Sequence, residues 1–333
     1  MIVARAPLRI PLGGGGTDLP SYAREHGGFV IGLAIARYVR VCANVLPLER
    51  GVRYTSGGAA GTAGPDEIPD PFVRAAMMGM CLPGGGIELL SLADVPSGTG
   101  LGLSSAFAVA LVAALHALAN DRLPRHELAA AAVAVERAAV GPAVGVQDHY
   151  LSALGGLHAL RVTPDGTVNP LKLPVAADVV DALSERLLLY YTGIRRSAIE
   201  FLREQAASTE RREPAVLESL HTVKRVGGEI HDALVAGDLD AIGRLMDLHW
   251  RAKKRRSKAI APAEVDDAYV RAVKAGALGG KLVGAGGGGF LLLYVPPDAQ
   301  CSVRAAMSDL RELPYAPDRQ GVVVVDTDAA GAP

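Results

Sequence analysis

Residues 92–118, with the sequence LADVPSGTGLGLSSAFAVALVAALHAL, contain the most informative pattern of the chain. Three closely spaced glycines lead into Ser104 and Ser105, and an alanine-rich apolar run without further glycine or proline follows. This order predicts a loop that opens a helix. Glycines let backbone N–H groups approach an anion, and a helix start has unpaired N–H groups at the positive end of its dipole. The stretch therefore predicts a polyphosphate site, with a glycine-rich turn of no chemical role as the alternative.

Two better-known glycine loops do not fit this stretch. A Walker A loop needs Gly-Lys followed directly by Ser or Thr, but Gly102 is followed by Leu103. The pair Gly280-Lys281 continues into Leu282 and fails the same test. A Rossmann fingerprint needs its third glycine at the position of Leu103. A phosphate loop in this chain would therefore belong to another class.

Length and charge favour a small-molecule partner. At 333 residues the chain is long enough for two domains of ordinary size. Its 34 basic and 35 acidic residues give a net charge of -1, which offers no electrostatic case for nucleic acid. The basic run RAKKRRSK at residues 251–258 is the local exception, and its ordinary interpretation is a solvated helix face.

The cysteines and the N-terminus indicate a reducing compartment. Cys42, Cys81 and Cys301 are far apart, odd in number and without Cys-x-x-Cys spacing, so we expect small apolar residues. Arg5 and Arg9 interrupt an N-terminus that has no long hydrophobic segment, so neither a signal peptide nor a membrane span is expected. The chain is predicted to be soluble and cytoplasmic.

Strands and helices mix along the chain without the regular alternation of a doubly wound sheet, which predicts an α+β fold. Composition makes residues 56–71 a surface loop and residues 163–174 a domain junction. We expect two domains, residues 1–170 with the phosphate loop and residues 171–333. Helices are expected at residues 71–81, 105–119, 125–139, 197–205, 215–235, 239–254, 265–275 and 302–313. Strands are expected at residues 2–12, 29–46, 87–92, 157–162, 187–191, 290–295 and 321–325.

Three glycine-bearing motifs stand in order: RAPLRI at residues 5–10 with GGGGTD at 13–18, then residues 96–106, then KLVGAGGGGF at 281–290. This set resembles the superfamily of galactokinase, homoserine kinase, mevalonate kinase and phosphomevalonate kinase over nearly the whole chain. Within it, QDHY at 147–150, YTGIRRS at 191–197 and the glycine-rich ending look most like the D-glycero-D-manno-heptose 7-phosphate kinases. Fucose 1-kinases share some of these features.

The resemblance implies an N-terminal domain similar to the second domain of ribosomal protein S5 and a ferredoxin-like C-terminal domain. ATP and sugar would meet in the cleft between them. The residues implied to bind the ATP phosphates are Pro96, Ser97, Gly98, Thr99, Gly100, Leu101, Gly102, Ser104 and Ser105. The C-terminal glycine motif would contribute Gly284, Gly286, Gly287 and Gly288. Leu103 departs from the family, which usually has Gly, Ser or Thr there.

Phosphoryl transfer needs a phosphate cradle, a cation and a residue that deprotonates the acceptor. Mg2+ takes few protein oxygens, and the resemblance implies Ser104 and Glu136 as its ligands, with Ser105 as the alternate serine. Asp148 matches the family's catalytic aspartate, and Arg9 matches the basic residue implied beside it. Without the resemblance, a glutamate on the solvent face of a helix is the favoured interpretation of Glu136. For Asp148 alone, the N-cap of the following helix is as good an interpretation as a catalytic role.

The sugar and its phosphate need further groups. Gly15, Gly16, Thr17 and Asp18 are the expected sugar-binding residues, because a carboxylate accepts two hydrogen bonds from vicinal hydroxyls; an Asx-turn is the alternative. Guanidinium forks and ammonium groups bind phosphate. The candidates for the substrate's phosphate are Arg195, Arg196, Lys253 and Lys254, with Arg256 as a further one, and a solvated surface is equally consistent with them.

These features predict an ATP- and Mg2+-dependent kinase that phosphorylates the C1 hydroxyl of a heptose 7-phosphate. The expected partners are ATP and a small-molecule sugar phosphate, with no nucleic acid and no membrane; a homodimer is left open. A fucose- or galactose-type sugar 1-kinase is the first alternative. A protein that senses ATP and sugar without turnover is the second, and a decarboxylase acting on a mevalonate-type acid is disfavoured by the Thr17-Asp18 loop.

Overall fold

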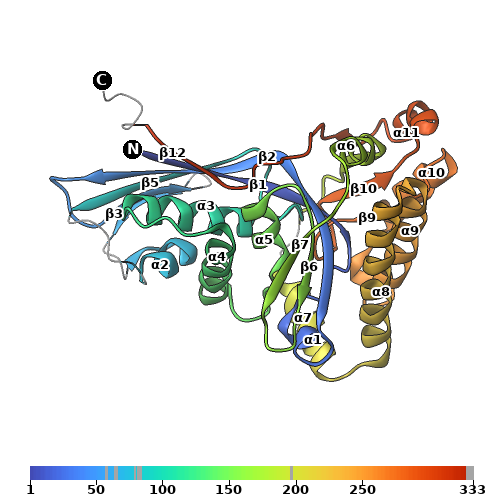
Figure 1. Cartoon of the computed structure of the whole chain (residues 1–333), viewed down its shortest axis with the longest axis horizontal. Coiled ribbons are helices and arrows are strands. Elements are labelled where there is room, and N and C mark those ends of the chain that lie inside the picture. The colour runs from blue at the N-terminus through green and yellow to red at the C-terminus, as the bar shows by residue number, and fades with distance from the viewer. Residues whose placement is uncertain (57–58, 64–66, 79, 81–84, 196–197, 328–333) are drawn as a thin grey trace.

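The computed structural model describes residues 1–56, 59–63, 67–78, 80, 85–195 and 198–327. Two sheets form the framework, and helices pack against each of them (Figure 1). The predicted α+β class is therefore confirmed. The beginning of the chain lies beside residues 323–326, because β12 pairs with β1.

The larger sheet has eight strands in the order β12-β1-β2-β5-β3-β4, and β6 extends it from β2 with β7 at its side. Its strands are β1 (Ile2–Gly13), β2 (Gly28–Leu46), β3 (Val52–Ser56), β4 (Ala59–Ala63), β5 (Gly86–Ala93), β6 (Leu157–Val162), β7 (Val168–Lys172) and β12 (Val323–Asp326). Pairing is antiparallel except between β3 and β5.

The paired strands β1 and β2 position Arg9 and the glycine-rich loop that follows β1. The register shifts once between Pro7 and Leu8 and again between Pro11 and Gly13, as expected where proline lacks the N–H that a ladder needs. Arg9 lies between the two shifts, opposite Ala34. Beyond Gly13, the chain leaves the sheet as the glycine-rich loop that leads to Asp18.

Helices cover one face of the larger sheet (Figure 1). They are α2 (Pro71–Met77), α3 (Leu103–Leu118), α4 (Arg125–Val140) and α5 (Gln147–Leu154). The central one, α3, is rich in alanine and buried along most of its length. Small side chains let it lie against β1 and β2 on one side and against α4 and α5 on the other, which fixes its N-terminus at the mouth of the phosphate loop.

The smaller sheet is antiparallel, with the strand order β11-β8-β10-β9. Its strands are β8 (Leu187–Tyr191), β9 (Gly279–Leu282), β10 (Phe290–Tyr294) and β11 (Arg311–Glu312). Helices α7 (Ala198–Glu210), α8 (Pro214–Ala236), α9 (Leu239–Lys254) and α10 (Ala263–Lys274) lie between β8 and β9 in the chain, and α11 (Gln300–Ala306) lies between β10 and β11. This β-α-β-β-α-β order and strand arrangement is ferredoxin-like, as predicted.

Two further contacts connect the halves. Helix α7 lies against α1 (Pro20–His26), and α8 packs against β1 and β2 (Figure 1). Within the part of the chain that the structure describes, every helix is too short or too polar to span a lipid bilayer.

Several sequence expectations were wrong. The predicted surface loop at 56–71 contains β4, which pairs with β3. The predicted junction at 163–174 contains β7, which pairs with β6, and helix α6 (Ala177–Arg186) was not predicted at all. The helix expected at 302–313 ends at Ala306. Since β7 crosses residue 170 and β12 returns to the first sheet, the chain does not divide cleanly there.

Candidate active site

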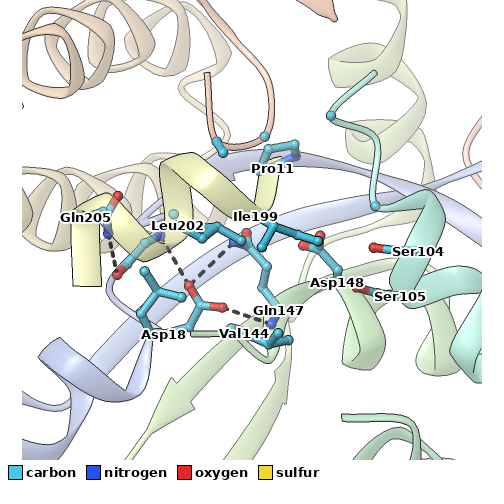
Figure 2. A pocket seen from close by; sticks show the side chains of 18 of the residues that line it. Pro11, Asp18, Ser104, Ser105, Val144, Gln147, Asp148, Ile199, Leu202 and Gln205 are labelled. Atoms are coloured by element: carbon cyan, nitrogen blue, oxygen red, sulfur yellow. Dashed lines mark hydrogen bonds between the residues drawn. The ribbon is translucent and has the colours of Figure 1, made fainter. Parts of the chain in front are cut away.

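A cavity of about 230 Å³ lies between the two halves of the molecule. The cavity is lined by β1 and the loop after it, the loop before α3 with the first turn of α3, and the chain from the end of α4 to the start of α5. The second half of the molecule contributes helix α7, the end of α9, and β9 with the β9–β10 connection. In Figure 2, Ser104 and Ser105 lie on one side of this cavity, Gln205 lies on the opposite side, and Asp148 lies between them.

The predicted phosphate loop forms one wall. Gly98, Gly100 and Gly102 have φ values of 74°, 83° and 76°, a left-handed conformation in which glycine is favoured. Gly102 is the N-cap of α3, so the unpaired N–H groups of that helix begin where the loop ends. The cavity lining includes residues 97–100 and 102–105. Leu101 is buried in the core and Pro96 lies outside the lining, so neither presents a side chain to the cavity.

The C-terminal glycine motif packs directly on this loop. A Cβ on Gly284 would lie 2.7 Å from the Cα of Gly100, and the Phe290 amide donates to the Thr99 carbonyl over 3.2 Å. Gly284 lines the cavity, whereas Gly286 and Gly288 pack on Ile260 and Ile194. The Gly287 amide donates to the Ile260 carbonyl. Gly284 and Phe290 therefore contact the phosphate loop, whereas Gly286, Gly287 and Gly288 pack on other segments.

Arg9 and Asp148 form a two-pronged ion pair at the centre of the cavity. Arg9 Nε donates to Asp148 Oδ1 over 2.6 Å, and Arg9 Nη2 lies 2.5 Å from Asp148 Oδ2. Arg9 Nη1 donates to the Gly100 carbonyl over 2.6 Å, which connects the pair to the phosphate loop. Arg9 is 3% exposed, whereas 22% of the Asp148 side chain remains exposed. Asp148 is therefore held in place yet open to the cavity.

Glu136 is not on a solvent face. Its two carboxylate oxygens accept hydrogen bonds from the Ser104 hydroxyl over 2.8 Å and from the Ser105 hydroxyl over 2.7 Å. His149 Nε2 lies 2.6 Å from Glu136 Oε2. Burial raises the pKa of Glu136, but the contacts with His149 and the two hydroxyls outweigh it, so the pKa lies below its ordinary value.

This cluster has the chemistry of a magnesium site. One carboxylate and one hydroxyl supply hard oxygen ligands, and Mg2+ fills its other positions with water and phosphate oxygens. Ser104 is exposed and Ser105 is buried, although both border the cavity. Among the described residues there is no group of three or more His, Cys, Asp or Glu side chains that would form a larger metal site.

Asp18 lines the cavity but is already strongly hydrogen-bonded. It accepts from the amides of Val146, Gln147 and Gly16 over 2.8, 3.1 and 3.2 Å, and it thereby fixes the start of α5. Burial raises the pKa of Asp18, and the backbone amide of Gln147 opposes that shift.

The other predicted sugar-binding residues divide into two groups. Gly15 and Gly16 line the cavity. Thr17 does not, because its hydroxyl donates to the carbonyls of Gly14 and Phe29 and accepts from the Phe29 amide. The structure therefore gives the Thr17 side chain a role in holding the loop, not in contacting a ligand in the cavity.

Of the residues predicted to bind the substrate's phosphate, some line the cavity and others do not. Lys253 is 6% exposed and lines the cavity, where it donates to the carbonyls of Leu282 and Gly284. Lys254 instead pairs with Asp266 outside the lining. Arg195 is exposed and donates to the Tyr191 hydroxyl, away from the cavity. Arg196 lies outside the described residues. Lys254 and Arg195 are therefore misplaced for this role.

Sequence reasoning missed several lining residues. Ile199, Leu202 and Gln205 lie on α7 (Figure 2). Two apolar residues three positions apart occur on many surface helices, so the sequence does not mark these residues as part of a site. His249 and Lys281 are 2% exposed and line the cavity. No local motif marks His249, and Lys281 opens the glycine-rich motif at residues 281–290, which by itself indicates no role for the lysine. Gln147 was recognised only as part of a family motif; its amide lies 3.5 Å from Asp18 Oδ1.

Comparison with known proteins agrees with this arrangement. The family model of the GHMP kinases N terminal domain matches residues 72–156, and the model of the GHMP kinases C terminal domain matches residues 230–310. The D-glycero-alpha-D-manno-heptose 7-phosphate kinase of Campylobacter jejuni is 28% identical over 320 residues, covering 92% of this chain and 93% of that protein. A galactokinase of Chloroflexus aggregans is 30% identical over 267 residues, covering 71% of this chain and 68% of that protein.

Solved structures agree on the fold. The crystal structure of a D-glycero-D-manno-heptose 1-phosphate kinase from Bacteroides thetaiotaomicron matches with a TM-score of 0.80 at 22% identity. The match covers 98% of this chain and 99% of that one. At this identity the likeness concerns the path of the backbone.

Proposed function

Because this chain belongs to the GHMP kinase family and is a sugar kinase, we propose that it phosphorylates the C1 hydroxyl of D-glycero-D-manno-heptose 7-phosphate with ATP and Mg2+. The product would be the 1,7-bisphosphate. The observation that carries the proposal is the Arg9–Asp148 pair, which borders both the phosphate loop and the cavity. The similarity to the heptose 7-phosphate kinase over almost the whole of both chains supports this acceptor.

Asp148 is proposed as the general base. Each carboxylate oxygen has two lone pairs, so Asp148 can accept the C1 hydroxyl proton while Arg9 occupies the other positions. The sugar oxygen then bonds to the γ-phosphorus, the bond from that phosphorus to the β,γ-bridging oxygen breaks, and ADP leaves. Arg9 holds the Asp148 carboxylate in position, and its positive charge would stabilise negative charge on the attacking oxygen.

The phosphate loop positions the nucleotide. Its left-handed glycines and the start of α3 present backbone N–H groups to the phosphates. Ser104 and Glu136 would hold Mg2+, which neutralises charge on the phosphate oxygens when bound. Ser105 and His149 would hold the Glu136 carboxylate in position for it, because both contact Oε2. The more exposed hydroxyl favours Ser104 over Ser105 as the ligand.

The sugar is proposed to lie between Asp148 and the Gly15–Gly16 loop. Asp18 retains lone pairs beyond its backbone contacts and lines this part of the cavity. Ile199 and Leu202 supply an apolar wall (Figure 2). Sugar-binding sites need such a wall to exclude water from the transferred phosphoryl group.

A substrate panel with ADP release as the readout tests this proposal. We expect heptose 7-phosphate to have the highest kcat/KM, and phosphorus NMR of the product to show the new phosphate on C1. The galactokinase similarity makes a fucose- or galactose-type 1-kinase the second candidate. A higher kcat/KM for either of those sugars would replace the first proposal with the second. No ADP release with any sugar would favour the non-catalytic sensor.

A further inference from the structure

Four nitrogen-bearing side chains face the cavity from α9, its C-terminal end and β9. They are His249, Lys253, Arg256 and Lys281, and we call them the basic wall. Across the remaining lining, the charged side chains are Arg9, Asp18, Glu136, Asp148 and Arg203. Arg9 is paired with Asp148, and Glu136 contacts His149. The basic wall is therefore not neutralised by acids of the cavity.

The two lysines and the arginine of this wall have no carboxylate partner among the described residues, and burial lowers the pKa of both lysines. Lys281 Nζ donates to the Leu12 carbonyl, and Lys253 Nζ donates to the carbonyls of Leu282 and Gly284. Burial and the charges of Arg256 and Arg9 lower the pKa of Lys253 to about 7. Buried cations without acids are costly, and an anionic ligand would offset that cost.

Arg256 has unused donors. Its Nε donates to the Ser219 hydroxyl over 2.8 Å, and its Nη1 donates to Gln205 Oε1 over 3.1 Å. Its Nη2 is buried and has no hydrogen-bond partner among the described residues. Nearby in the wall, both ring nitrogens of His249 are also buried without a partner there. Buried polar atoms in this state indicate that a ligand completes the site.

Arg256 lies beside the Gly15–Gly16 loop, where the sugar is proposed to bind. A Cβ on Gly16 would lie 2.9 Å from Arg256 Nη1 and 2.8 Å from Gln205 Nε2, so both side chains close on this loop. Figure 2 shows Gln205 on the opposite side of the cavity from Ser104 and Ser105, with Asp148 between them. Arg256 is therefore placed near the proposed sugar and away from the two serines of the phosphate loop.

We propose that Arg256, with Lys253 beside it, binds a phosphate group at the far end of the acceptor, so that the substrate is a phosphorylated sugar. This inference rests on the proposed kinase activity and adds the residue that selects among sugars. Arg256 Nη2 carries two unused N–H groups, and Lys253 Nζ has a third donor after its two carbonyl contacts. A phosphate dianion accepts several such charged hydrogen bonds at once.

The test compares heptose 7-phosphate with unphosphorylated heptose in wild type and in Arg256→Gln. Wild type should prefer the phosphorylated sugar, and Arg256→Gln should lower the ratio of the two kcat/KM values by about 10- to 100-fold, as for the loss of charged hydrogen bonds. Arg256→Lys keeps the positive charge but loses the paired N–H donors of the guanidinium. Its ratio should lie between those of wild type and Arg256→Gln. Arg255→Gln is the matched control, because Arg255 is largely exposed and lies 3.7 Å from Glu218; its ratio should stay at the wild-type value.

A binding measurement tests the inference in variants whose turnover is too low for a reliable kcat/KM. Calorimetry with heptose 7-phosphate, in the presence of a non-hydrolysable ATP analogue and Mg2+, should show the same loss of affinity in Arg256→Gln. Thermal unfolding checks that each variant is folded. An Arg256→Gln ratio equal to wild type would overturn the inference while the kinase proposal stands. A wild type that prefers unphosphorylated heptose would overturn both the inference and the proposed acceptor. A folded wild type that phosphorylates neither sugar and binds neither would instead remove the proposed function.

Discussion

Arg9 and Asp148 are 139 residues apart in the sequence, yet Arg9 donates to both carboxylate oxygens of Asp148. Arg9 comes from the middle of β1 and Asp148 from the first turn of α5. Arg9 Nη1 also donates to the Gly100 carbonyl, which brings the phosphate loop to the same point. The proposed chemistry depends on this convergence of three segments.

Asp148→Asn should lower kcat by about 10²- to 10⁴-fold, the usual range for loss of a general base. Asparagine fills the same space but does not take up the C1 proton. ATP affinity should remain close to wild type, because the phosphate loop is unchanged. Steady-state kinetics and nucleotide titration measure both quantities, and a rate near that of wild type would reject Asp148 as the base.

Arg9→Ala should also remove most turnover, because Asp148 then loses the two hydrogen bonds that orient its carboxylate. Stability should fall by about 3 kcal/mol, as when one partner of a buried pair is removed. Arg5→Ala is the control on the same strand, since Arg5 donates to Gln320 instead. Denaturant unfolding and kcat together check the prediction, which fails if Arg9→Ala and Arg5→Ala behave alike.

Glu136→Gln should raise the Mg2+ concentration needed for half-maximal activity by at least about tenfold, in line with the loss of a metal-site group. Glutamine keeps the side-chain length but removes the anionic oxygen. Glu127→Gln on the same helix is the control, because Glu127 is exposed. Calorimetric titration of Mg2+ with ATP gives a readout independent of turnover. Equal Mg2+ requirements for the two variants would contradict the assignment.

Gly284→Ala should destabilise the protein more than Gly166→Ala. Both glycines have positive φ, at 72° and 89°, so each alanine should cost about 1–2 kcal/mol of backbone strain. Only at Gly284 would the added Cβ also meet backbone, 2.7 Å from Gly100 Cα, while nothing lies within 4 Å at Gly166. Gly284→Ala should therefore also raise KM for ATP. A Gly166→Ala variant with an equal loss of stability would contradict the predicted clash.

Stability should rise with pH in a way that depends on Lys253. Burial and the nearby Arg256 and Arg9 lower its folded-state pKa to about 7, whereas the unfolded value is about 10.4. Between these values the unfolded chain binds the extra proton, so the free energy of unfolding should increase by about 1.4 kcal/mol per pH unit. Urea unfolding from pH 7 to 9.5 should show a steeper rise in wild type than in Lys253→Met. Parallel slopes would mean that folding does not lower the pKa of Lys253.

The sequence supported the fold and the two glycine loops because both depend on local rules. Prolines and glycines mark the ends of β1 and the phosphate loop, and the alanine-rich run predicts α3. By contrast, β4 (AAGTA) and β7 (VNPLK) pair with the neighbouring strands β3 and β6, but their glycine and proline are typical of loops and hide the strand signal. The return of β12 to β1 joins the two ends of the chain, and a short stretch carries no signal for such a contact.

In the site, too, residues within local motifs could be predicted, and residues whose placement depends on the folded structure could not. Asp148, Arg9, Glu136 and Ser104 were predicted from motifs, and the structure brings all four to one cavity. In the basic run at 251–258, the sequence does not show which side chains face the cavity, because this depends on how α9 is rotated about its own axis. Lys253 faces the cavity, whereas Lys254 turns to Asp266.

The account rests most directly on proton removal from the C1 hydroxyl by Asp148. Phosphorus NMR of heptose 7-phosphate with ATP and Mg2+ tests this step in a single experiment, using wild type and Asp148→Asn. The account predicts a new anomeric phosphate signal with wild type and only a trace of it, over the same time, with the variant. The same signal growing at the same rate in both samples would contradict it.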